Sequence, residues 1–188
     1  MRKGSIRFQY NSPVVLTLAL LALGTLLLQK LSGGWTTMKF FSVYRSSLAD
    51  FWTYPRFVLH VLGHTGYSHY IGNMMMILVV GPPLEEKYGS RSLLLAIFLT
   101  ALISGMVQWL FFPGTALLGA SGIVFMMIVM SSLSGMKEGC IPITLILVLM
   151  LYVGREVVDG VVLSDNVSQL THIIGGLCGA LFGLSVRR

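Results

Sequence analysis

Three separate stretches of the sequence contain residue types that together could perform acyl-transfer chemistry. The first is the GASG stretch at residues 119–122, which holds Ser121, and the second is His172, near the start of the last apolar run. A serine hydroxyl is a weak nucleophile until a positioned base, most often a histidine, removes its proton. The third is the pair His69 and Asn73, whose four-residue spacing puts both side chains on one helix face, about 6 Å apart along the axis.

Ser121 is expected at the start of a short helix. The apolar run at residues 120–134 would be only about 22 Å long as a helix, against a hydrocarbon core of roughly 30 Å. The uncharged segment 113–119 would fill the difference as a loop that dips into the protein, lining a wet cavity. The free N–H groups and positive dipole of a helix start suit a developing oxyanion. On this stretch alone, an ordinary helix N-cap with packing glycines at Gly119 and Gly122 is the simpler explanation.

The residues after His172 strengthen the catalytic interpretation. A stripe of small residues follows it, formed by Gly175, Gly179 and Gly183. Such a stripe permits very close helix packing, so we expect the last helix to pack against the one that begins at Ser121. Contact between Ser121 and His172 would make a dyad, and Phe125, four residues after Ser121, could hold the imidazole by stacking. All seven carboxylates fall in predicted loops or at span ends; Asp165 is the only plausible orienter, and we do not expect it to serve.

The composition predicts the elements that must position these residues. Of 188 residues, 55% are hydrophobic and 11% charged, against roughly 45 to 50% and about 25% in soluble domains. This excludes an ordinary soluble domain, and the scattered Gly and Pro exclude a disordered or collagen-like chain. Six apolar runs of membrane-spanning character occur at about residues 13–31, 68–87, 90–112, 120–134, 141–157 and 167–186. We predict an all-α membrane protein: one six-helix domain over residues 1–188, with its core at about 13–186.

The charges predict an orientation in the cell membrane. Placing both termini in the cytoplasm puts eight basic residues inside, in agreement with the positive-inside rule: Arg2, Lys3, Arg7, Lys87, Arg91, Lys137, Arg187 and Arg188. The candidate site then opens to the outer side. The aromatic-rich first loop, residues 32–66, should lie on or in the outer leaflet. The net charge is +6, but the Lys and Arg residues do not cluster on one face, so no nucleic-acid partner is expected. Cys140 and Cys178 are expected to be reduced packing residues.

These motifs resemble those of the rhomboid family of intramembrane serine proteases. The resemblance covers about residues 56–183 and corresponds to the minimal six-helix form, which looks bacterial. It is carried by a histidine and an asparagine four residues apart on the second helix, by a GxSG motif, and by a sixth-helix histidine followed by spaced glycines. The matching positions are His69, Asn73, 119–122, His172, Gly175 and Gly179.

The resemblance implies a role for each matching position. Ser121 would be the nucleophile and His172 the general base, then acid. His69, Asn73 and the Ser121 N–H would hold the oxyanion, while Gly119, Gly122 and Phe125 support the site and no cofactor or metal takes part. Glu85 and Gly89 would form a structural element. Two departures affect the anchoring of the first loop and the orientation of His172: the common Trp-Arg dipeptide is Pro55-Arg56, with Trp52 displaced, and a position often held by Tyr is Phe125.

The expected function is hydrolysis of a peptide bond in or near the transmembrane segment of another membrane protein. Its partners would be transmembrane protein substrates and membrane lipid. A metal-dependent enzyme is one alternative, because His60 and His64 are four residues apart and His69 is close. Two others are a non-catalytic protein that binds transmembrane helices, and a transporter that moves protons or ions through the histidines.

Overall fold

A computed structural model describes residues 9–134 and 166–185, together with residues 140, 143, 144, 146, 147 and 150. The elements are α1 (Pro13–Leu31), α2 (Trp35–Phe40), α3 (Thr53–Leu59), η1 (His60–Leu62), α4 (Tyr67–Tyr88), α5 (Ser90–Phe111), α6 (Ser121–Ser134) and α8 (Asn166–Ser185). The described part of the chain is therefore mostly helical, and its long helices agree with five predicted spans to within one residue. The predicted fifth span, at 141–157, lies outside the described residues except at five positions, and Asp165 lies outside them too.

The long helices differ in how well they suit a bilayer. Within the described residues, α1 and α5 are long and apolar enough to cross a membrane, with 19 and 22 residues and a mean hydropathy of 2.1 each. α4 also has 22 residues, but it carries His69, Asn73 and a charged last turn. α6 is shorter, as expected from the sequence. Six crossings therefore remain a prediction.

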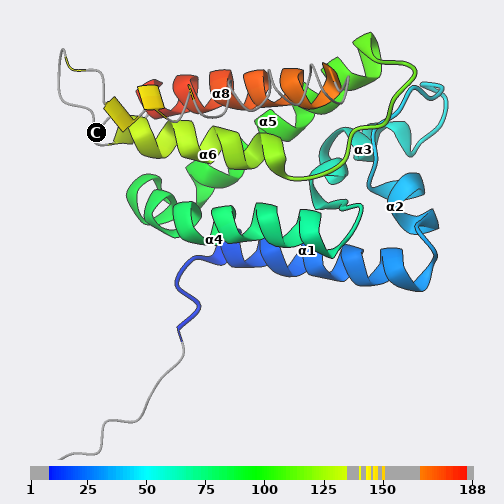
Figure 1. Cartoon of the computed structure of the whole chain (residues 1–188), viewed down its shortest axis with the longest axis horizontal. Coiled ribbons are helices and arrows are strands. Elements are labelled where there is room, and N and C mark those ends of the chain that lie inside the picture. Colours follow the sequence, from blue (N-terminus) through cyan, green and yellow to red (C-terminus); the bar gives the residue numbers. More distant parts are fainter. Residues whose placement is uncertain are drawn as a thin grey trace, which may run out of the picture.

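α6 lies at the centre of the helix packing. Ten of its 14 residues are buried, as expected for a helix that is apolar on all sides. It packs against α8 on one side and α4 on another, while α1 packs along α4 and α5 contacts α8 and α3. Figure 1 shows α6 and α8 side by side and α1 beneath α4, with α2 and α3 at one end.

The glycine stripe of α8 makes its contact with α6 unusually close. The carbonyl oxygens of Gly122 and Met126 stand where Cβ atoms of Gly175 and Gly179 would be. Any side chain at these two positions would collide with the α6 backbone. The prediction that the stripe packs the last helix against the helix of Ser121 is confirmed.

The first loop is more ordered than the sequence indicated, because it contains α2, α3 and η1. Arg56 is almost fully buried, with only 4% of its surface exposed. Its polar contacts hold this region together. Its Nε donates a hydrogen bond to the Lys39 carbonyl (2.7 Å), its Nη1 pairs with Asp50 (3.2 Å), and its guanidinium lies over the Tyr44 ring at 4.6 Å. Helices of six and seven residues need such tertiary contacts, which leave no periodic pattern in the sequence.

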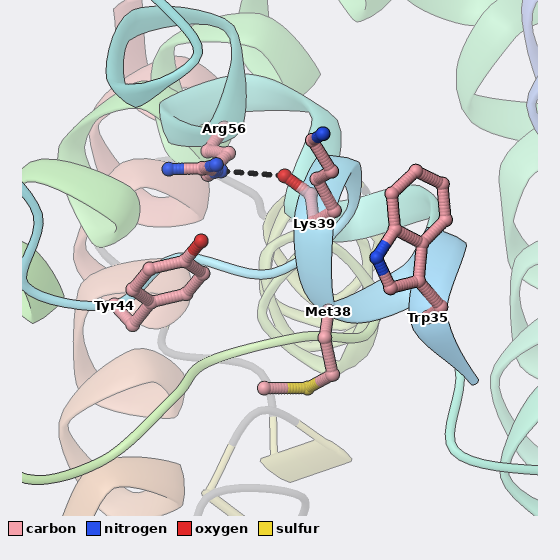
Figure 2. A pocket seen from close by; sticks show the side chains of 5 residues that line it. All are labelled: Trp35, Met38, Lys39, Tyr44 and Arg56. Carbon is pink, nitrogen blue, oxygen red and sulfur yellow. Dashed lines mark hydrogen bonds between the residues drawn. The ribbon is translucent and has the colours of Figure 1, made fainter. Parts of the chain in front are cut away.

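A pocket of about 410 Å³ opens beside these contacts of Arg56 (Figure 2). It is lined by Trp35, Met38, Lys39, Tyr44 and Arg56. None of the candidate catalytic residues lines it, so it is separate from the proposed chemistry. Trp35 and the nearby Phe51 and Tyr54 keep more than half of their surface exposed, an arrangement suited to a membrane interface.

Glu85 joins α4 to the start of α1. Its carboxylate, buried with the rest of the side chain, accepts hydrogen bonds from the N–H groups of Val14 (3.0 Å) and Val15 (3.1 Å) and from the Ser90 hydroxyl (2.7 Å). The first N–H groups of a helix lack partners within the helix and favour a negative charge. Glu85 therefore acts structurally, as the cap of another helix.

Candidate active site

The segment that leads into Ser121 is anchored to the first loop. Val43 and Leu117 exchange two backbone hydrogen bonds of 2.9 and 2.8 Å, and the Gly119 N–H donates to the His60 carbonyl at 2.9 Å. Leu117 and Ala120 are buried, so this segment enters the protein as the sequence predicted. Ser121 follows as the first residue of α6 and is partly exposed.

Gly119 meets two side chains from α4. Its φ is +113°, in the region that favours glycine. The Cε1 and Nε2 atoms of His69 would lie 2.7 Å from a Cβ at this position, and Nδ2 of Asn73 would lie 3.8 Å away. The structure thus brings His69 and Asn73 together beside the residue two positions before Ser121, and only glycine leaves room for the imidazole.

His172 approaches α6 from the other side. Its neighbour Thr171 packs on Gly122. A Cβ atom added at Gly122 would lie 2.8 Å from Cγ2 of Thr171. The rings of Phe125 and His172 have centroids 5.9 Å apart and planes inclined by 54°. Phe125 therefore contacts the imidazole, in a tilted arrangement rather than the predicted stack. The buried His172 lies along the first turns of α6, the helix that begins at Ser121.

His64 is a part of this region that the sequence analysis considered only as a metal ligand. It is fully buried, and burial, opposed by a hydrogen bond to Leu62, lowers its pKa to about 4. Its Nδ1 donates to the Leu62 carbonyl (3.1 Å), and its Nε2 accepts from Asn73 Nδ2 (3.2 Å). The ring centroids of His64 and His69 are 5.0 Å apart. The only sequence signal for this contact with Asn73 is the presence of a histidine shortly before the His69 and Asn73 pair.

The metal-site alternative receives no support from these contacts. His60 Nε2 donates to the Ala101 carbonyl at 3.1 Å, on α5, whereas His64 bonds to Leu62 and Asn73. Over the residues that the structure describes, no three His, Cys, Asp or Glu side chains are grouped so that they could share an ion.

Comparison with known proteins identifies the family of this chain. A family model described as the Rhomboid domain matches residues 50–188, most of the chain. The chain belongs to the rhomboid family. Members of this family are integral membrane proteins, in agreement with the apolar helices α1 and α5.

Relatives of this rhomboid occur in animals and bacteria. It is 32% identical over 143 residues to Rhomboid-related protein 1 of Caenorhabditis elegans, covering 70% of this chain and 39% of that protein. Rhomboid-related protein 2 of Mus musculus is 30% identical over 146 residues, covering 70% of this chain and 47% of its own. Rhomboid protease GlpG of Pectobacterium atrosepticum is 25% identical over 179 residues, which cover 92% of this chain and 62% of that protein. The chain spans about half the length of such relatives.

Proposed function

We propose that this rhomboid is an intramembrane serine endopeptidase that cleaves other membrane proteins in or near a transmembrane segment. The observation that carries the proposal is the convergence on the start of α6, where His69 and Asn73 arrive from α4 and His172 from α8. A nucleophile, a base and two hydrogen-bond donors are the parts that amide hydrolysis requires. One relative is named a protease.

Each part has a defined task in the proposed mechanism. The Ser121 hydroxyl attacks the carbonyl carbon while His172 takes its proton, and His172 then protonates the leaving amine. The N–H of Ser121 and the side chains of His69 and Asn73 stabilise the oxyanion. Water, activated by His172, hydrolyses the acyl-enzyme. No metal or cofactor enters these steps.

The substrate must expose a carbonyl that a transmembrane helix normally keeps hydrogen-bonded. We expect helix-breaking or small residues near the scissile bond, because they ease local unwinding. The proposed topology has both chain termini in the cytoplasm and the active site open to the outer side. Lipid and the transmembrane substrate are then the partners of this protein.

The test is cleavage of a reporter transmembrane protein in proteoliposomes. The wild type should cleave it and Ser121→Ala should not, whereas Asn73→Ala should retain about 0.1 to 10% of the turnover, since one oxyanion donor contributes up to about 1000-fold. Cleavage that persists in Ser121→Ala, or that a chelator abolishes, would refute the proposal. Reporter binding without cleavage would favour the non-catalytic alternative, and an ion flux unaffected by Ser121→Ala would favour transport.

A further inference from the structure

His64 lies at the end of the first loop, between η1 and α4, outside the set of residues assigned to the proposed chemistry. None of its surface is exposed, and its ring packs edge-on against His69 and Tyr70, with centroids 5.0 and 5.6 Å away. A buried imidazole must satisfy both of its ring nitrogens. The partners of those nitrogens determine what His64 does to its neighbours.

The two hydrogen bonds of His64 select one tautomer. The Leu62 carbonyl can only accept, so the Nδ1 atom that lies 3.1 Å from it carries the proton. Nε2 of the neutral ring is then a lone-pair acceptor, in agreement with the amide nitrogen of Asn73 at 3.2 Å. The Leu62 carbonyl is itself held, since it also accepts from the Thr25 hydroxyl of α1. The acceptor offered to Asn73 is therefore anchored to backbone and to a second helix.

This acceptor decides which end of the Asn73 amide faces the active site. If the amide were turned over, its oxygen would face the lone pair of His64 Nε2, and two acceptors would repel. With the nitrogen facing His64, one N–H is engaged and Nδ2 is the Asn73 atom nearest to Gly119. The second N–H of the Asn73 amide stays available on the side of Gly119, and Gly119 belongs to the segment that leads directly into Ser121. An oxyanion needs an N–H there, because an amide oxygen would repel its charge.

We infer that His64 is a positioning residue that fixes the Asn73 amide with its N–H toward the oxyanion. The inference rests on the proposed function and adds a residue to it. His64 itself touches no substrate. Its effect should appear in turnover, because a donor held in place for the oxyanion contributes in the transition state and little in substrate binding.

The test compares two amide substitutions, since an Asn amide reaches the place of the imidazole Nδ1 and a Gln amide reaches the place of Nε2. His64→Asn can keep the bond to the Leu62 carbonyl but loses the acceptor for Asn73. His64→Gln can keep the acceptor, through its Oε1, and loses the bond to Leu62. We expect His64→Asn to lower the kcat of reporter cleavage by roughly 10- to 100-fold with little change in KM, and His64→Gln to restore most of that loss. A role limited to anchoring the loop predicts the reverse order.

Two further measurements separate positioning from stability. In an Asn73→Ala background, His64→Asn and His64→Gln should have equal kcat, because the residue through which His64 acts is gone. In protein labelled with 15N-histidine, His64 should show a protonated Nδ1 and an unprotonated Nε2; a protonated Nε2 would overturn the inference. Equal kcat of the two His64 variants beside an active wild type would overturn only the positioning role. Absence of Ser121-dependent cleavage in the wild type would overturn the proposed function itself.

Discussion

The two sides of Ser121 are built by different physical means. On the α8 side, His172 is carried by a helix in which Gly175 and Gly179 lie directly on the backbone of α6. On the α4 side, His69 and Asn73 belong to a helix whose start is linked to the first loop by hydrogen bonds of His64 and Thr65. Steric contact positions His172, whereas a polar network positions His69 and Asn73.

The difference determines how each side responds to change. Backbone contact between α6 and α8 leaves no room for an added methyl group, so it should fail abruptly when a side chain is introduced. A hydrogen-bonded network loses one partner at a time, and each lost bond costs about 1 kcal/mol. The network also contains buried titratable rings, so it should respond gradually to pH.

Gly175→Ala should have the largest effect. Its Cβ would collide with the Gly122 carbonyl oxygen, and α8 must move away from α6 to admit it. We expect reporter cleavage to fall by about 100-fold, as a misplaced base can cost, and the free energy of unfolding to fall by about 3 kcal/mol. Cleavage in proteoliposomes and thermal unfolding in detergent measure the two effects.

Two glycines provide matched controls for Gly175→Ala. A Cβ at Gly24, in α1, would meet nothing within 4 Å, and a Cβ at Gly183 would meet first the Leu133 side chain, at 3.2 Å. Gly24→Ala should be neutral or stabilise by up to about 1 kcal/mol, as expected for a helix, and Gly183→Ala should fall between the two. Equal behaviour of all three variants would show that backbone contact does not hold the α8 side.

Mild acid should destabilise the protein by a smaller amount, through His64 on the α4 side and through His60, which is hydrogen-bonded to Ala101 of α5. Burial lowers the pKa of both His60 and His64 to about 4, below the value of about 6.5 in an unfolded chain. The unfolded chain therefore binds more protons between pH 6.5 and 4, so the stabilisation is complete above pH 6.5 and is lost as pH falls through this window. Between pH 7.5 and 5.5 the free energy of unfolding should fall by about 1 kcal/mol for each ring.

His64→Gln tests this assignment. It removes one of the two rings, so about half of the acid destabilisation between pH 7.5 and 5.5 should disappear from detergent unfolding curves. An unchanged slope in His64→Gln would show that the acid response arises elsewhere in the protein.

The α8 side could be predicted from the sequence, and the α4 side only in part. The regular stripe from Gly175 to Gly183 and the continuous apolar run after Ser121 are visible in the sequence, so they predicted both helices and their contact. The helices around Arg56 were missed because tertiary bonds to Lys39 and Asp50 hold them. The part played by His64 depends on a backbone carbonyl, which no pattern of side chains can reveal.

The proposed function requires Ser121 to act as a nucleophile activated by His172. Its most direct test is reaction of the detergent-purified protein with a fluorophosphonate probe, followed by mapping of the labelled residue. We predict labelling of Ser121 in the wild type, strongly reduced labelling in His172→Ala and none in Ser121→Ala. Labelling of equal strength in Ser121→Ala would show that the reactive nucleophile is another residue.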